Sequence, residues 1–99
     1  MAEEVQKKLI IKKKIYNRLQ KESKFYENEI EQLNDTIEQM EKEDPENYEI
    51  NKKKEMVEES EQVLKEVKKK TEQAQEDLYN FIEDHLDDDT LNNEIISDL

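Results

Sequence analysis

The stretch Glu43-Asp44-Pro45-Glu46-Asn47-Tyr48-Glu49-Ile50 interrupts a chain of regularly spaced apolar residues. Before it, apolar or seam positions recur in alternating steps of four and three, at 5, 9, 12, 16, 19, 23, 26, 30, 33, 37 and 40. After it, the same steps recur at 50, 53, 57, 60, 64, 67, 71, 74, 78, 81 and 85. This spacing keeps one stripe of a helix against a partner helix. Because the single proline, Pro45, cannot continue a helix, the pattern predicts two long helices that fold back on each other.

The composition favours one helical domain over residues 1–99. Charged residues make up 44% of the chain and hydrophobic residues 32%, and the net charge is −12. A chain this polar approaches the disordered class. The sustained period favours a folded chain, because it gathers the scarce apolar residues onto narrow stripes.

Missing residue types exclude several kinds of site. The chain has no glycine for a phosphate-binding loop, no cysteine for a disulfide or thiolate site, and one histidine. The run at residues 87–89 is acidic but lacks the glycine and glutamate spacing of a calcium loop. We therefore expect no enzyme activity, no catalytic residue, no cofactor and no metal.

Nucleic acid and membrane are not expected partners. The negative net charge disfavours contact with phosphates. No apolar run approaches the roughly 18 residues of a membrane span, and residues 1–4 do not resemble a signal peptide. Residues 5–21 alone would read as a basic amphipathic helix for a membrane surface or calmodulin, but the chain itself supplies an acidic partner segment.

The charge distribution favours an antiparallel pairing of the helices. Residues 1–24 carry eight Lys/Arg and three acids, whereas residues 76–99 carry nine acids and no base. A reversal near Pro45 brings the basic cluster that includes Lys12 beside Asp77, and Lys54 near Glu41. Opposite charges beside an apolar seam select orientation. We expect a monomer, although a swapped dimer would satisfy the same charges.

The expected fold is all-α: an antiparallel hairpin of two long helices with a short third helix. Helix 1 is expected at about 4–42, the turn at 43–47, helix 2 at about 47–86 and helix 3 at about 90–99. Off-seam apolar residues near the chain ends, Ile10, Ile11, Ile15, Tyr79, Ile82 and Leu86, form a second stripe where helix 3 would dock. The prediction is a spectrin-like three-helix bundle with coiled-coil packing that thins toward the turn.

Several single residues carry structural expectations. Asp44 or Asn47 would cap the second helix, and Tyr48 would pack over the tip of the hairpin. Ser23 and Ser60 on the seam would specify register. Lys12 and His85, also on the seam, would extend their polar ends to water or bond locally.

The turn also carries a resemblance to a known family. The residues that carry it are Glu43, Asp44, Glu46, Asn47, Tyr48, Ile50 and Lys52. They resemble the E-D-x-E-N-Y-D-I-K-K stretch of the tubulin-binding cofactor A family, whose members are tubulin-specific chaperones. Further similar stretches are Arg18-Leu19, Lys21-Glu22, Tyr26-Glu27, residues 37–40, Glu59-Ser60 and parts of residues 77–83. The resemblance covers about residues 15–84.

The resemblance implies a chaperone that captures β-tubulin before heterodimer assembly. It implies a cytoplasmic, cytoskeleton-associated protein with β-tubulin as partner, and other tubulin-folding cofactors as further partners. The alternative is a structural or adaptor coiled-coil protein with no chaperone role. The expected partner-binding residues are Arg18, Lys21, Glu22, Glu27, Glu29, Glu43, Asp44, Glu46, Asn47, Tyr48 and Glu59.

Overall fold

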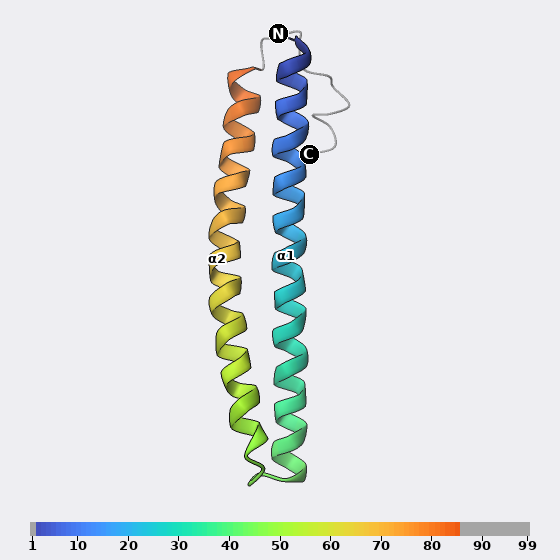
Figure 1. The fold of residues 1–99 in the computed structure, drawn as a ribbon, viewed down its shortest axis with the longest axis vertical. Helices are drawn as coiled ribbons and strands as arrows, with labels where there is room; N and C mark the ends of the chain where they lie inside the picture. Colours follow the sequence, from blue (N-terminus) through green and yellow to red (C-terminus); the bar gives the residue numbers. More distant parts are fainter. Residues whose placement is uncertain (1, 86–99) are drawn as a thin grey trace. The chain divides into compact units, whose positions relative to one another are not determined.

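The computed structural model describes residues 2–85, which form two long helices (Figure 1). Helix α1 spans Ala2–Glu43 and helix α2 spans Glu49–Asp84. Residues 2–85 contain no strand, so the described chain is all-helical as predicted. The expected third helix at 90–99 lies outside the described residues.

A tight turn separates the helices at residues 44–48. The amide of Asn47 donates to the carbonyl oxygen of Asp44 at 3.1 Å, which closes a turn with Pro45 at its second position, where the fixed φ of proline fits. The side-chain Oδ1 of Asn47 accepts a hydrogen bond from the amide of Glu49 at 2.9 Å. The sequence predicts that the second helix begins near residue 47. It begins at Glu49 instead, because Asn47 caps α2 from outside the helix.

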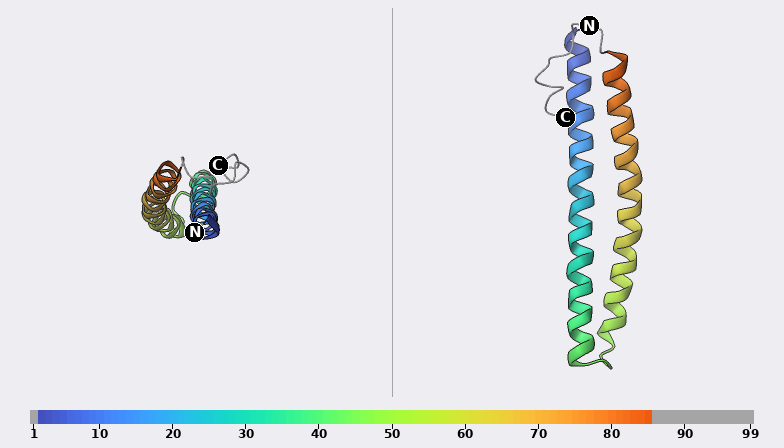
Figure 2. Two further views of the ribbon diagram at one scale, coloured as in Figure 1. Left: turned by 90° about the horizontal axis from the view of Figure 1, so that it is seen from above. Right: turned by 180° about the vertical axis from the view of Figure 1, so that it is seen from behind.

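The chain divides into two compact units, and each contains a segment of both helices. Of the described residues, unit 1 comprises 2–20 and 69–85, and unit 2 comprises 21–68. In each unit, the segments of α1 and α2 lie side by side and run in opposite directions (Figures 1 and 2). The antiparallel pairing predicted from charge is therefore present in each unit.

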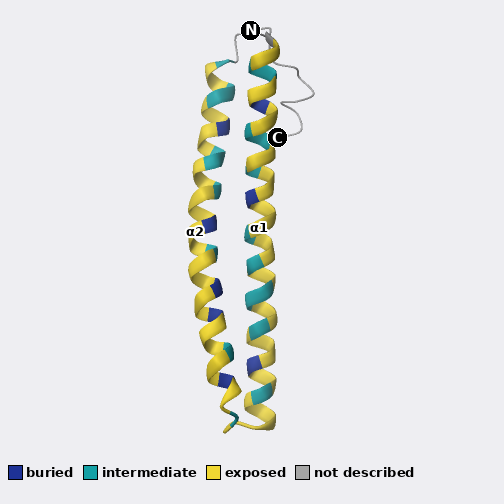
Figure 3. Cartoon of the chain, viewed as in Figure 1, coloured by how far each residue is buried: buried dark blue, intermediate teal, exposed yellow. Residues whose placement is uncertain are grey.

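Unit 2 has its core between the two helices and close to the turn. Ile37 of α1 packs with Ile50 and Val57 of α2, and the partly buried Ile30, Leu33 and Met40 pack against this cluster. Ser60 and Val67 are also buried. In Figure 3 the buried positions lie on the sides of the two helices that face each other. Every seam position predicted in this unit is buried or half-buried.

Unit 1 contains the two most fully buried side chains, Leu9 and Leu78, and a buried Leu19. All other predicted seam positions of this unit are half-buried. Beside the seam, Ile10, Ile11, Ile15 and Tyr79 are exposed. Of the other residues predicted for the second apolar stripe, Ile82 is half-buried and Leu86 lies outside the described residues.

Ion pairs between the helices confirm the predicted register. In unit 1, Lys12 Nζ lies 2.7 Å from Asp77 Oδ2. In unit 2, Lys54 Nζ lies 3.2 Å from Glu41 Oε1, and Lys68 Nζ lies 3.5 Å from Glu27 Oε1. Exposed pairs of this kind contribute about 0.2–1 kcal/mol each, so they select orientation more than they stabilise.

Neither helix of the described chain is long and apolar enough to cross a membrane.

Candidate functional site

The turn presents an exposed, mostly acidic surface. Glu43, Asp44 and Glu46 are exposed, and the Nε2 of Gln39 donates to Oε1 of Glu43 at 3.3 Å. Asn47 is half-buried because its side chain caps α2. The three carboxylates can therefore contact a partner, whereas Asn47 has a structural task.

Tyr48 does not pack over the tip of the hairpin, so that expectation is wrong. Its side chain is 70% exposed, and the Nζ of Lys52 lies 5.3 Å from the centre of its ring. Tyr48 lies just before α2, and Lys52 lies in the first turn of that helix, four residues further along the chain. The ring is thus an aromatic contact available to a partner, accompanied by a cation.

The expected partner-binding residues of α1 fall in both units and differ in exposure. Arg18 lies in unit 1 and is exposed. In unit 2, Lys21 and Glu22 are exposed. Glu27 is exposed and pairs with Lys68. Glu29 is half-buried and accepts a hydrogen bond from Ser60 Oγ at 3.5 Å.

Glu59 belongs to an acidic stretch of α2 in unit 2. With Glu55, Glu58, Glu61 and Gln62 it lines a surface depression of about 410 Å³. Glu59 precedes Ser60, whose hydroxyl bonds to Glu29 of α1. The structure thus brings Glu29 and Glu59 to neighbouring places across unit 2.

The predicted residues do not form one site. Glu27 and Glu43 belong to the same helix and are separated by 16 residues, or roughly 24 Å at 1.5 Å per residue. Within unit 2 the residues near the turn and those near Glu29 and Glu59 are therefore two separate groups. Extended surfaces of this kind suit a protein partner rather than a small molecule.

Unit 1 contains a groove that sequence reasoning did not assign. It has a volume of about 490 Å³ and is lined by Lys8, Ile11, Lys12, Ile15, Ala74, Asp77 and Phe81. The ammonium of Lys12 pairs with Asp77 and also lies 5.4 Å from the ring centre of Phe81. The sequence signal for this groove is Lys12, a lysine on the apolar seam, which predicts an ammonium directed to water rather than to Phe81.

The described surface offers contacts rather than reactive groups. Within residues 2–85 no three His, Cys, Asp or Glu side chains gather in a way that could hold a metal ion. The hollows on the two units are lined by carboxylates, ammonium groups and apolar side chains. These groups can bind a complementary protein surface.

The chain is similar to known proteins over most of its length. Residues 4–98 match the family described as Tubulin binding cofactor A. The Tubulin-specific chaperone A proteins of Bos taurus, Homo sapiens and Mus musculus are each 36% identical over 87 residues. These alignments cover 88% of this chain and 81% of each relative. No solved structure matches the chain significantly.

Proposed function

Because the chain belongs to the Tubulin binding cofactor A family, we propose that it is a tubulin-folding chaperone that captures β-tubulin before heterodimer assembly. The observation that carries the proposal is the match over residues 4–98, which includes α1 except for its first two residues, the turn and the whole of α2. The relatives named Tubulin-specific chaperone A support the same role. Capture of this kind requires surface contact and no bond chemistry, and we propose no catalytic residue or cofactor.

The proposed partner surface comprises the charged residues of α1, the turn and Glu59. Of the residues expected from sequence, Arg18, Lys21, Glu22, Glu43, Asp44, Glu46, Tyr48 and Glu59 are exposed. Within the chain, Glu27 pairs with Lys68, Glu29 and Glu43 each accept a side-chain hydrogen bond, and Asn47 caps α2. We propose β-tubulin as the client, other tubulin-folding cofactors as further partners, and a cytoplasmic, cytoskeleton-associated location.

We further propose that residues 90–99 form a third helix that completes a spectrin-like three-helix bundle at unit 1. The exposed Ile10, Ile11, Ile15 and Tyr79 supply an apolar surface for it. Residues 90–99 supply Leu91, Ile95, Ile96 and Leu99 at helical spacing. The lysines of the unit 1 groove complement the acids at 87–89, 94 and 98. A monomer is the proposed state.

Binding to purified tubulin chains tests the function. The full chain should form a complex with β-tubulin released from a folding reaction, detected as co-elution in size-exclusion chromatography. Actin released from the same reaction is the control client and should not co-elute. Failure to bind β-tubulin under conditions in which the chain is helical would favour the structural or adaptor role instead.

A further inference from the structure

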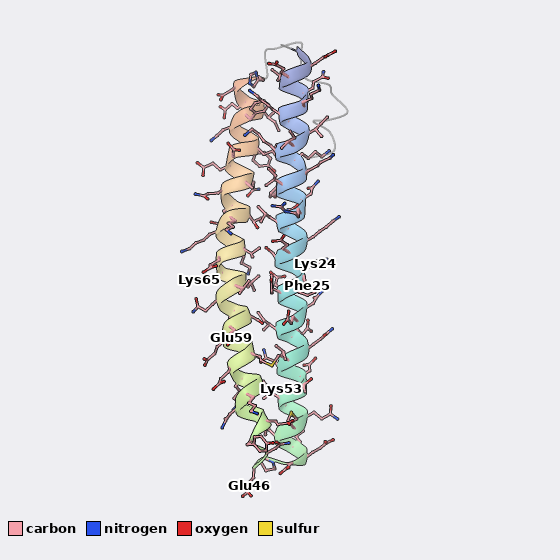
Figure 4. The ribbon with its side chains drawn as sticks, viewed as in Figure 1. Lys24, Phe25, Glu46, Lys53, Glu59 and Lys65 are labelled. Atoms are coloured by element: carbon pink, nitrogen blue, oxygen red, sulfur yellow. The ribbon has the colours of Figure 1, made fainter. Side chains whose placement is uncertain are left out.

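Three large apolar side chains are exposed on unit 2, away from the turn. Phe25 of α1 (Figure 4) is 62% exposed, and Met56 and Val63 of α2 are 44% and 38% exposed. They lie beside the seam residues Tyr26, Val57 and Leu64 rather than on the seam. We call Phe25, Met56 and Val63 the apolar strip. Single apolar residues scattered over a surface are ordinary, whereas apolar residues that lie together mark a binding surface.

The hydrogen bond between Ser60 and Glu29 places the three residues of the apolar strip on one side of unit 2. Glu29 and Ser60 face each other, because their side-chain oxygens are 3.5 Å apart. In an antiparallel pair, moving one turn back along α1 reaches Phe25 while moving one turn forward along α2 reaches Val63. Met56 lies one turn from Ser60 in the opposite direction. The strip therefore follows the line where the two helices meet, with Val63 and Met56 about 10 Å apart.

Acidic side chains border this strip on both helices. Glu22 and Glu29 lie three and four residues from Phe25 on α1. Glu59 and Glu66 lie within one turn of Val63 on α2, and Figure 4 labels Glu59. We call these four glutamates the acidic rim. The sequence has acids but no Lys or Arg between residues 25 and 36 and between residues 55 and 64, so the part of the surface around Glu29 and Glu59 is strongly acidic, whereas Glu22 and Glu66 have Lys21 and Lys65 as sequence neighbours.

We propose that the apolar strip and acidic rim bind a basic amphipathic helix of the client protein. This inference rests on the proposed chaperone function. A helix with apolar residues at i and i+7 would set them about 10 Å apart, which matches Val63 and Met56, while its flanking lysines or arginines would face the rim. Helix-in-groove recognition uses this combination of apolar anchors and polar flanks.

Charge separates this occupant from the others. A second copy seated symmetrically on the strip would bring its own four glutamates against the rim, and like charges in contact are unfavourable. An acidic phospholipid surface would be repelled in the same way. A helix with positive flanks is attracted, so charge complementarity selects it.

The first test replaces the apolar anchors. The Phe25→Gln/Met56→Gln variant should lose at least about tenfold in affinity for β-tubulin, since central apolar anchors dominate binding energy. Its melting temperature should change little because Phe25 is 62% exposed and Met56 is 44% exposed, so neither side chain belongs to the buried core. Phe25→Leu, which keeps an apolar group, should retain most of the affinity. Unchanged capture by the double Gln variant would overturn the proposal.

The second test removes the rim charges with a matched control. Glu59→Gln/Glu66→Gln should slow association at low salt about two- to fivefold, and the difference should shrink as salt is added. Glu31→Gln/Asp35→Asn makes the same charge change at exposed residues of α1 that belong neither to the rim nor to the depression lined by Glu59, and should leave association unchanged. Equal effects of the two pairs would mean that only net charge matters, which would overturn the role of the rim.

A model peptide separates this proposal from the chaperone function. The probe is a synthetic 20-residue helix with a leucine stripe and lysine flanks, together with a version in which glutamate replaces lysine. The wild-type chain should bind the lysine peptide, and the Phe25→Gln/Met56→Gln variant should not. If the chain binds the peptide but not β-tubulin, the proposed chaperone function is wrong, while the apolar strip remains a binding site for a basic amphipathic helix. Loss of a dimer in that variant would identify a second copy as the occupant and refute the proposal.

Discussion

Lys12 shows how a charged residue can occupy the apolar seam of unit 1. Its ammonium pairs with Asp77 at 2.7 Å and lies over the ring of Phe81, while its side chain remains 27% exposed. The aliphatic stem can thus cover apolar surface while the charge keeps both a counterion and water. Ser60 in unit 2 is the comparable polar residue, and its hydroxyl has Glu29 as a partner. Lys12 and Ser60 are thus each accommodated by a side chain of the opposite helix.

Leu78 should be more important for stability than Leu33. Leu78 has no exposed surface, whereas Leu33 is only half-buried. Leu78→Ala should lower the free energy of unfolding by about 2–4 kcal/mol, because it leaves a cavity as well as losing apolar burial. Leu33→Ala should cost roughly half as much, since water can reach part of the site. Urea unfolding followed by circular dichroism at 222 nm measures both, and equal losses would contradict the difference in burial.

At the scale of the helices, the seam could be predicted and the details of its surroundings could not. The seam follows from a period that repeats along each helix, so every predicted position within residues 2–85 proved buried or half-buried. The start of α2 was less certain because Asp44 and Asn47 are both good capping residues. The sequence did not predict that the Tyr48 ring lies beside Lys52 rather than over the tip of the hairpin, because this contact depends on the side-chain conformation of Tyr48.

The candidate surface shows the same division. The residues of the turn could be named from their resemblance to a family, and the structure places most of them at the surface. The apolar strip could not be assembled from the sequence, because it needs the register between α1 and α2. That register is given by contacts such as Ser60 with Glu29.

The two candidate caps of α2 should differ in their effect on stability. Asn47 accepts a hydrogen bond from the amide of Glu49, whereas Asp44 contributes its backbone carbonyl to the turn. Asn47→Ala should therefore destabilise the protein by about 1 kcal/mol. Asp44→Ala keeps the backbone bond and should cost less than about 0.5 kcal/mol. Thermal unfolding of the two variants at equal concentration compares them, and a larger loss for Asp44→Ala would reverse the assignment of the cap.

At the scale of the whole molecule, the chain combines a high net charge with sparse apolar burial. The net charge is −12 and the hydrophobic share 32%, so self-repulsion opposes folding and association of copies. Each described unit compensates by burying its few large apolar side chains between two helices. Apolar residues left outside these cores are therefore the natural places to look for contacts with other segments or partners.

The proposed third helix gives the last prediction. If residues 90–99 cover the exposed isoleucines of unit 1, Leu91→Ser/Ile95→Ser should remove their apolar contacts and lower the melting temperature of the full chain. Asn92→Ser/Asn93→Ser is the matched control, because it changes two neighbouring polar residues and should leave the melting temperature nearly unchanged. Leu91→Ser/Ile95→Ser should lower the free energy of unfolding by about 1–3 kcal/mol, the amount expected for partial burial of two aliphatic side chains.

Two further readings on the same samples locate the effect. The Leu91→Ser/Ile95→Ser variant should bind more of an apolar dye than its control. The reason is that loss of the third helix would uncover Ile10, Ile11, Ile15 and Tyr79. Sedimentation equilibrium should show that the wild-type chain is a monomer, as a third helix from the same chain leaves this surface covered without a second copy. If the two variant pairs melt alike and bind dye alike, residues 90–99 do not cover unit 1, and a partner or second copy must be sought for that surface instead.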